Sequence, residues 1–203
     1  MVITISRQLG SGGSEIGKKL AEKLGYAYYD KKIIEIASAK SGISEEMFEK
    51  AEKEHNSFLY SLATANYAGY TATVINGDIS NSDNLFVIQS NVIREIAQKG
   101  NCVIVGRCAN QVLIEEPDVL KVFLHANKEF RTKRVMNNLN LILKDAESLI
   151  KKTDKKRASY YNFFTSGTWG DASDYDLCVD SSILGIDGTT DIIEAFAKKT
   201  GKL

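Results

Sequence analysis

A glycine-rich turn over residues 10–14 restricts the possible folds of this chain more than any other feature. Residues 2–6 (VITIS) are rich in β-branched side chains and predict a strand that ends just before the turn. After the turn, apolar residues recur at helical spacing up to Gly25, a good helix stop, and residues 26–29 predict a second strand. A strand, a turn, a helix and a strand within about 30 residues form a βαβ unit, with parallel strands and a right-handed crossover.

Three further runs extend the predicted sheet. Residues 102–105 and 119–124 are strongly apolar on both faces, which is typical of parallel strands covered by helices, and residues 175–179 predict a fifth strand. Helical patterns occur at about 85–99, 127–139, 142–160 and 189–199. A chain of 203 residues is long enough for one well-buried core. We therefore predict a single domain over residues 1–203, an α/β protein whose five-stranded parallel sheet lies between two helical layers.

The region from Ser41 to Asn84 does not follow this alternation of strands and helices. Ser44 is a good N-cap for an acidic amphipathic helix, but residues 56–82 form a polar, tyrosine-containing stretch without a clear period. We interpret residues 41–84 as an inserted helical lobe rather than a separate domain. Within it, residues 64–83 are predicted to form a mobile loop.

Composition excludes several classes of protein. The 26 Lys and Arg residues balance the 26 Asp and Glu residues, which argues against a general binder of nucleic acid or of a membrane surface. No signal peptide precedes the first strand, and no apolar run approaches the roughly 20 residues that span a bilayer, so the expected location is the cytoplasm. The three cysteines lack Cys-x-x-Cys spacing and indicate neither a zinc site nor a disulfide framework. The oligomeric state is left open.

The glycine turn is also the first candidate for function. A turn that opens a helix can present several backbone N–H groups at the positive end of the helix dipole, and this arrangement suits phosphate. Gly10, Gly12 and Gly13 would let a ligand approach the backbone closely. The alternative is that these glycines serve only the geometry of the turn. The strand before the turn and the helix after it favour anion binding.

The turn departs from the usual phosphate-binding pattern, Gly-x4-Gly-Lys-Ser/Thr. Aligning that pattern places Arg7 on the first glycine, Gly12 on the second, Gly13 on the lysine and Ser14 on the hydroxyl that normally reaches Mg²⁺. The charge that usually follows the β- and γ-phosphates is therefore missing from its position. Arg7, or a basic residue from elsewhere, would have to supply it.

Several stretches together resemble the cytidylate kinase family of P-loop nucleoside monophosphate kinases, and more closely its cytidylate kinase-like branch. Residues 5–14 (ISRQLGSGGS) and 16–25 (IGKKLAEKLG) resemble the family's phosphate loop and first helix. Residues 103–107 (VIVGR), 119–126 and the basic stretch 127–134 follow in the family's order. Residues 154–157 (DKKR) are similar to its lid motif Asp-x-x-Arg, and residues 175–182 to its final strand. The resemblance covers most of the chain outside residues 41–84 and implies a P-loop NTPase fold.

The resemblance implies an ATP- and Mg²⁺-dependent phosphotransferase that acts on a nucleotide or a small phosphate acceptor, with a lid at about residues 131–160. Its site residues fall into four groups. The residues that would contact the donor phosphates are Arg7, Gly10, Ser11, Gly12, Gly13 and Ser14, and Ser14 would also bind Mg²⁺. The residues that would contact the acceptor are Asp30, Lys31, Arg107, Asp154 and Arg157. The catalytic residues would be Arg107, Arg131, Arg134 and Arg157, of which Arg131 and Arg134 belong to the lid. Arginine suits these positions because its planar fork makes two-point contacts with phosphate.

Each of these arginines also has a structural interpretation. Arg131 and Arg134 could form an ordinary solvated helix face, and Arg157 could be a salt-bridge partner of Asp154. Residues 165–171 (TSGTWGD) hold the only tryptophan, Trp169, which we interpret as a hydrophobic plug beneath the lid.

Four positions differ from the family's pattern. The loop lysine is Gly13, the strand aspartate that helps to place magnesium is Val105, the base-reading aspartate is Cys108, and Ile36 lies near the expected arginine of the acceptor segment. The identity of the acceptor and the catalytic competence are therefore open. The alternatives to an enzyme are a catalytically impaired regulatory protein that binds nucleotide or phosphate, and a purely structural or interaction domain.

Overall fold

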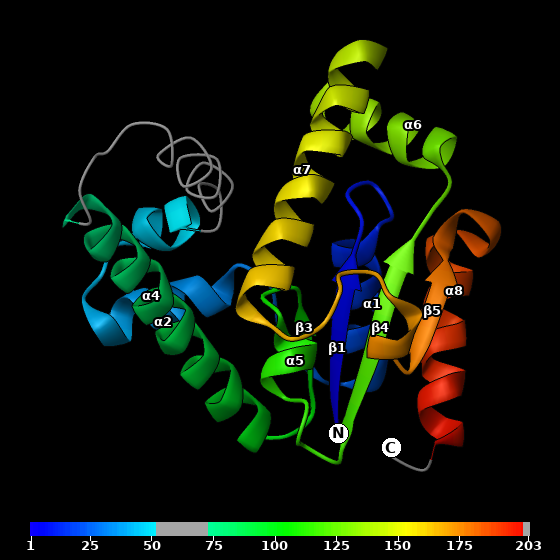
Figure 1. The fold of residues 1–203 in the computed structure, drawn as a ribbon. Helices are drawn as coiled ribbons and strands as arrows, with labels where there is room; N and C mark the ends of the chain where they lie inside the picture. Colours follow the sequence, from blue (N-terminus) through cyan, green and yellow to red (C-terminus); the bar gives the residue numbers. More distant parts are fainter. Residues whose placement is uncertain (52–72, 201–203) are drawn as a thin grey trace.

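The computed structural model describes residues 1–51 and 73–200, and for residues 73–82 it describes the backbone alone. Its centre is a parallel sheet in the order β2-β3-β1-β4-β5 (Figure 1). The strands are β1 (Val2–Arg7), β2 (Ala27–Tyr29), β3 (Cys102–Val105), β4 (Val119–His125) and β5 (Leu177–Asp180). Val2 aligns with Cys102 on one side and with Val119 on the other, so β1, β3 and β4 start in register. The predicted five-stranded parallel sheet is confirmed.

Helices cover both faces of the sheet. Ile3 and Ile5 of β1 face a core formed with α1 (Gly13–Leu24) and α8 (Ser181–Lys199). Val2, one residue out of phase, faces the opposite core, formed with α2 (Lys32–Ser41), α4 (Thr73–Gln98) and the short α5 (Ala109–Val112). Because alternate side chains of a strand point to opposite faces, one buried strand serves both cores. Figure 1 shows α2 and α4 side by side, and the separate cores on the two faces of the sheet confirm the three layers.

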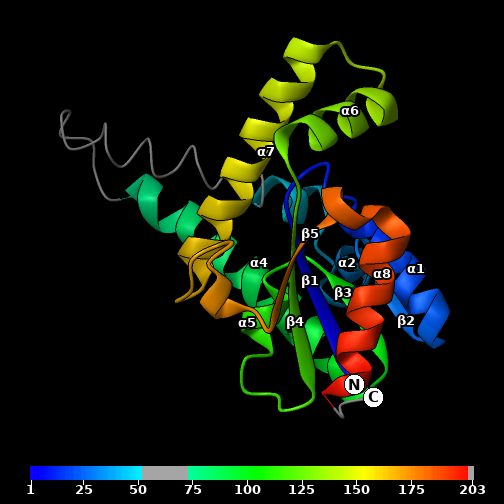
Figure 2. The same ribbon diagram turned by 90° about the vertical axis from the view of Figure 1, so that its right-hand side faces the viewer.

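A helical hairpin extends beyond the carboxyl end of the sheet. It consists of α6 (Lys128–Leu139) and α7 (Leu143–Phe164), which stand above β1 and β4 in both views (Figures 1 and 2). Asn127 caps α6 by accepting a hydrogen bond from the Phe130 N–H at 2.8 Å. Val135, Ala146 and Ile150 form a small core between the two helices. Residues 131–160, predicted as the lid, form most of this hairpin.

The predicted boundaries differ from the structure in two places. Residues 73–83 belong to α4, so the expected loop over 64–83 is wrong for this part, and α4 continues through Asn84 without a break. Residues 52–72 of the expected lobe lie outside the described residues. The helix predicted for 189–199 begins at Ser181, because Asp180 caps it by accepting from the Ser182 N–H at 2.9 Å. Gly185 interrupts the helical backbone of α8 with a positive φ of 66°.

None of the helices in the described part of the chain is long and apolar enough to cross a membrane.

Candidate active site at the phosphate loop

The loop between β1 and α1 has the backbone that its glycines predict. Gly10 and Gly12 both have φ values of 84°, in the left-handed region that favours glycine, and Gly12 is the N-cap of α1. Ser11 is fully buried, and its hydroxyl donates to the Gln8 carbonyl at 2.9 Å. The Ser181 hydroxyl donates to the Ser11 carbonyl at 2.7 Å. Ser11 therefore fixes the shape of the loop from beneath, and its side chain does not face the cavity.

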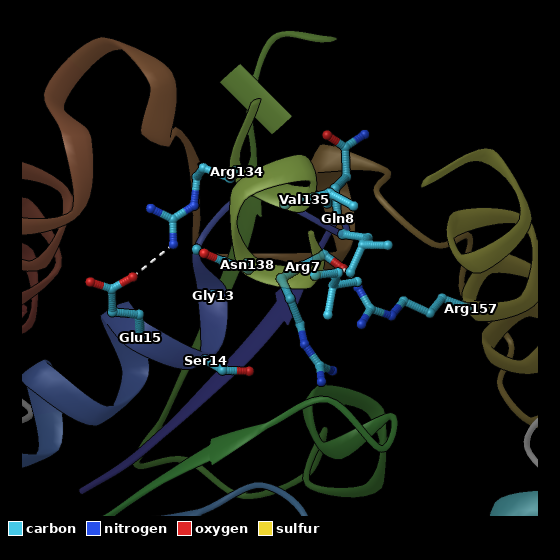
Figure 3. A pocket seen from close by; sticks show the side chains of 13 residues that line it. Arg7, Gln8, Gly13, Ser14, Glu15, Arg134, Val135, Asn138 and Arg157 are labelled. Carbon is cyan, nitrogen blue, oxygen red and sulfur yellow. Dashed lines mark hydrogen bonds and ion pairs between the residues drawn. The ribbon is translucent and has the colours of Figure 1, made fainter. Parts of the chain in front are cut away.

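Residues at the start of α1 line a cavity of about 280 Å³. The N–H groups of Gly12, Gly13 and Ser14 donate to no acceptor within the described residues, as expected for the first turn of a helix. Three segments supply the lining, namely the loop with the start of α1, helix α6 and helix α7. The lining includes Arg7, Gly10, Gly12, Gly13, Ser14, Glu15, Arg134, Asn138 and Arg157 (Figure 3).

Two lid arginines reach the loop from opposite sides in Figure 3, Arg134 from α6 and Arg157 from α7. A terminal nitrogen of Arg134 lies 2.7 Å from a Glu15 carboxylate oxygen, while its Nε is buried and has no hydrogen-bond partner among the described residues. Arg157 donates to the Arg7 carbonyl at 3.0 Å. Both arginines therefore line this cavity. The sequence predicted Arg134 over the donor phosphates and Arg157 at the acceptor phosphate.

Arg131 and Asp154 do not line this cavity but connect the lid to the loop. Arg131 Nη1 lies 2.5 Å from Asp154 Oδ2, and Asp154 Oδ1 accepts from the Leu9 N–H at 2.8 Å. Arg131 also donates to the Leu9 carbonyl at 3.3 Å. The two side chains are only 13% and 16% exposed, respectively. In this conformation both oxygens of Asp154 are engaged by the protein, which gives Asp154 a positioning role that its sequence position did not predict.

Gly10 explains why α6 can approach the loop so closely. A Cβ atom added at Gly10 would lie 2.7 Å from the backbone oxygen of Arg131, a distance that a backbone atom cannot relieve. Gly10 is therefore required both for its positive φ and for the contact with α6.

A second, narrower cavity of about 30 Å³ lies at the carboxyl end of β1 and β3. Gly106, Arg107 and Cys108 after β3 all have positive φ, and a non-glycine residue in this region costs about 1–3 kcal/mol. This turn directs residues 106–108 to the cavity. Apart from Ser6, the rest of the lining is basic or aromatic and consists of Arg7, Arg157, Tyr160, Tyr161 and Trp169. Trp169, expected to be a plug, also packs edge-on against Phe123 at 5.5 Å between ring centroids.

Arg7 and Arg157 line both cavities. The sequence predicted each of them as a phosphate-binding residue but not that they would lie at the boundary between the two cavities. Lys31 is exposed, and neither Lys31 nor Asp30 lines either cavity among the described residues. The sequence-predicted acceptor set is therefore divided, with Arg107 and Arg157 at the narrow cavity and Asp30, Lys31 and Asp154 outside it.

Asp30 lies beside the start of α1. Its Oδ2 accepts from the Ser14 hydroxyl at 2.8 Å and from the Tyr28 hydroxyl at 3.3 Å, and its Oδ1 lies 3.5 Å from an Arg7 nitrogen. Burial and the neighbouring Asp30 carboxylate raise the pKa of Tyr28 to about 12. The Tyr28 hydroxyl therefore stays protonated at neutral pH and remains a hydrogen-bond donor.

Comparisons with known proteins agree with this geometry. The model of the cytidylate kinase-like family matches residues 2–183. A cytidylate kinase of Methanococcus vannielii is 30% identical over 98% of this chain and 100% of its own length. A cytidylate kinase of Methanopyrus kandleri is 28% identical over 96% of this chain and 92% of its own length.

Solved structures have the same arrangement of elements. An uncharacterized protein from Eubacterium ventriosum is similar with a TM-score of 0.67 and 28% identity, with 98% of each chain covered. A shikimate kinase from Bacteroides thetaiotaomicron, at 13% identity, has a TM-score of 0.54 over 98% of each chain. This second likeness bears on the fold alone, and it agrees with the P-loop kinase architecture.

Proposed function

The chain belongs to the cytidylate kinase-like family, and from this premise we propose that it transfers a phosphoryl group from ATP·Mg²⁺ to a nucleoside monophosphate or a related small phosphate acceptor. The observation that carries the proposal is the pair of cavities that share Arg7 and Arg157. A donor in the larger cavity and an acceptor phosphate in the smaller one would meet at these two guanidinium groups. Phosphoryl transfer requires mainly alignment and positive charge around the transferred group.

The larger cavity suits a polyphosphate. Gly12, Gly13 and Ser14 line it and carry N–H groups without an acceptor among the described residues, and the buried Arg134 Nε is a further donor without a partner there. A Cβ atom at Gly13 would lie 2.7 Å from the Arg7 side chain, so the close approach of Arg7 to the loop backbone depends on glycine. These features fit the phosphates of ATP, with Arg134 and Arg157 as lid residues over them.

Arg7 is the cation that we assign to the role of the missing lysine. Its side chain crosses Gly13, the position at which the usual pattern has lysine, and it lines both cavities. Arg7 is a fixed charge at neutral pH and offers two-point contacts to a phosphate. Magnesium would be held at Ser14, and when bound it would neutralise charge on the donor phosphates.

Arg107 and Arg157 would hold the acceptor phosphate in the narrow cavity, and Tyr160, Tyr161 and Trp169 would surround the rest of the acceptor. Cys108 stands where the family reads its base with a carboxylate, and a thiol cannot reproduce that hydrogen-bond pattern. We therefore propose an acceptor defined by its phosphate rather than by a cytosine amino group. Closure of the hairpin would exclude water from the donor.

The second candidate is a regulatory protein that binds nucleotide without turnover. Gly13 and Val105 favour it, because the loop lysine and the strand aspartate are both replaced by uncharged residues. Arg7, Arg107, Arg134 and Arg157 around the two cavities favour the enzyme.

Thermal shift with ATP·Mg²⁺ and a panel of monophosphates, followed by coupled ADP release, separates these candidates. The enzyme predicts acceptor-dependent ADP release, and the regulatory protein predicts saturable ATP binding without it. A lack of any nucleotide shift would contradict both.

Replacement of Arg107 tests the assignment of the acceptor site. We expect R107A to reduce acceptor-dependent turnover by about 100-fold or more while ATP binding stays nearly intact. R94A, which removes an exposed arginine of α4, is the matched control and should turn over normally. Wild-type turnover in R107A would remove Arg107 from the site.

A further inference from the structure

The strongest unassigned feature near the loop is the contact between Ser14 and Asp30. The two residues come from different elements, the first turn of α1 and the end of β2, and the Ser14 hydroxyl donates to Asp30 Oδ2 at 2.8 Å. Ser14 lines the donor cavity, and Asp30 lies directly behind it. A hydroxyl and a carboxylate at this distance form a pair of hard oxygen ligands beside a phosphate cradle.

We propose that Asp30, together with Ser14, forms the magnesium site of the donor nucleotide, in place of the strand carboxylate that Val105 replaces. The proposal rests on the proposed function, since it requires that ATP occupies the loop. Magnesium in nucleotide sites is typically held by one or two carboxylates together with the substrate phosphates and water. The described residues contain no group of three or more His, Cys, Asp or Glu that could hold a metal by themselves. A single carboxylate that cooperates with phosphates fits this composition.

The other carboxylates near the loop are committed to arginines. Glu15 lies 2.7 Å from Arg134, and Asp154 lies 2.5 Å from Arg131 while it also accepts from the Leu9 N–H. The nearest atoms of Asp30 and Arg7 are 3.5 Å apart, beyond the 2.7–2.9 Å of a strong charge-assisted hydrogen bond. Val105 is fully buried, and Val105 Cγ2 would lie 2.8 Å from a Cβ added at Gly17, so no polar group reaches the loop from that position. Asp30 is also paired with an arginine, but through the longest of these contacts, and of these carboxylates it is the one hydrogen-bonded to Ser14.

Tyr28 positions this carboxylate. Its hydroxyl donates either to Asp30 Oδ2 at 3.3 Å or to the Ser14 carbonyl at 3.1 Å. Outer hydrogen bonds of this kind orient the ligands of a metal and hold them in place. A cation bound at Asp30 would compete with Arg7 for the carboxylate. The Arg7 guanidinium would then be available to bind the phosphates.

Isothermal titration calorimetry separates the metal site from the nucleotide site. ATP is titrated with EDTA present and again with Mg²⁺, and the ratio of the two dissociation constants measures the gain from the metal. We expect D30N to reduce this gain by at least about tenfold, the range found when ligand-supporting groups of metal sites are lost. The affinity for metal-free ATP should stay equal or increase, because D30N removes a negative charge from the loop.

Two further variants make the result specific. S14A should also reduce the gain, and it leaves the contact between Asp30 and Arg7 in place. E22Q removes an exposed carboxylate near the end of α1, outside the cavity, and should leave the ratio unchanged. With Mn²⁺ as the probe, the electron paramagnetic resonance signal of Mn·ATP should change on binding to wild-type protein and change less with D30N.

The outcomes distinguish this inference from the proposed function. If wild-type protein binds ATP with a gain from Mg²⁺ and D30N keeps the full gain, Asp30 is not part of the metal site, and the donor site stands. If wild-type protein binds no ATP in either condition, the proposed function fails and the metal site fails with it. Loss of metal-free ATP binding in D30N alone would show that Asp30 supports the fold of the loop, which overturns the inference.

Discussion

Restoring the missing lysine should damage the phosphate loop rather than repair it. A Cβ atom at Gly13 would lie 2.7 Å from both Cβ and Cγ of Arg7, whereas ordinary contacts between carbon atoms are about 3.5–4.0 Å. These are the first two atoms of the side chain, so rotation of its far end cannot relieve the contact. Gly13 does not have a positive φ, and a side chain there would otherwise be tolerated.

The expected magnitude follows from these two effects. Overpacking of this kind costs about 1–3 kcal/mol, and replacing a helical glycine returns about 0.5–1 kcal/mol. G13K should therefore destabilise the protein by about 0.5–2 kcal/mol. For a chain of this length that corresponds to a decrease in Tm of about 1–8 °C. Displacement of Arg7 should weaken ATP binding as well.

The reciprocal exchange is the decisive variant. R7G removes both atoms that the new side chain would meet, and the double variant R7G/G13K contains the full pattern Gly-x4-Gly-Lys-Ser over residues 7–14. We expect each single variant to bind ATP weakly and the double variant to recover binding, with a coupling of at least about 1 kcal/mol, or about fivefold in Kd, by a double-mutant cycle in calorimetry. If G13K is as stable as wild type and binds ATP equally well, or if the two effects simply add, the steric argument is wrong.

Two further predictions concern charges near the loop. E15Q should raise the affinity for ATP, because the half-exposed Glu15 competes with phosphate for Arg134. Such exposed ion pairs contribute only about 0.2–1 kcal/mol, so calorimetry should show an increase of up to about fivefold. An unchanged affinity would show that Arg134 does not contact the nucleotide. D180A should lower stability at pH 7 by about 1 kcal/mol through loss of the α8 cap. Hydrogen bonds from Ser182 and the charge of His125 lower the pKa of Asp180. The difference in stability between wild type and D180A should therefore be present above pH 4 and shrink as the pH falls through the lowered pKa. A difference in Tm that is independent of pH would contradict this prediction.

The elements that the sequence predicted well are those that one physical signal determines. β3 is a continuous apolar run, β4 is interrupted only by Lys121 before its end, and β1 is rich in β-branched residues, because both faces of a central parallel strand are buried. The start of α8 was missed although Asp180 and Ser182 form a good cap, because Ile183 and Leu184 are exposed and blur the helical period. Residues 73–83 are rich in Asn, Asp, Ser and Gly, which favour turns, yet they continue a helix whose later turns are anchored by Val92, Ile93 and Ile96. The packed later turns of α4 let the helix extend into this segment against its local preference.

At the site, spacing predicted which residues gather but not which atoms meet. Arg7, Arg134 and Arg157 all line the larger cavity, although the sequence predicted Arg157 for the acceptor phosphate. The partner of Asp154 is Arg131 on the preceding helix, and this contact depends on how α6 and α7 cross, which no local pattern determines. The contact between Ser14 and Asp30 likewise requires β2 to lie beside the start of α1.

Because α6 is anchored on Gly10 and Leu9, the phosphate loop is the point about which the hairpin of α6 and α7 would rotate. The backbone of Arg131 packs against Gly10, and the Arg131 side chain binds the Leu9 carbonyl and Asp154. The other end of α6, at Asn140, is nine residues away, which is about 13 Å at 1.5 Å per residue. A rotation of about 10° at this point would displace the tip of the hairpin by about 2 Å. Small adjustments of the loop around different phosphates would thus be magnified at Ile142, an exposed residue at the tip of the hairpin that lines neither cavity. A fluorophore or spin label there could report the length of the bound polyphosphate chain.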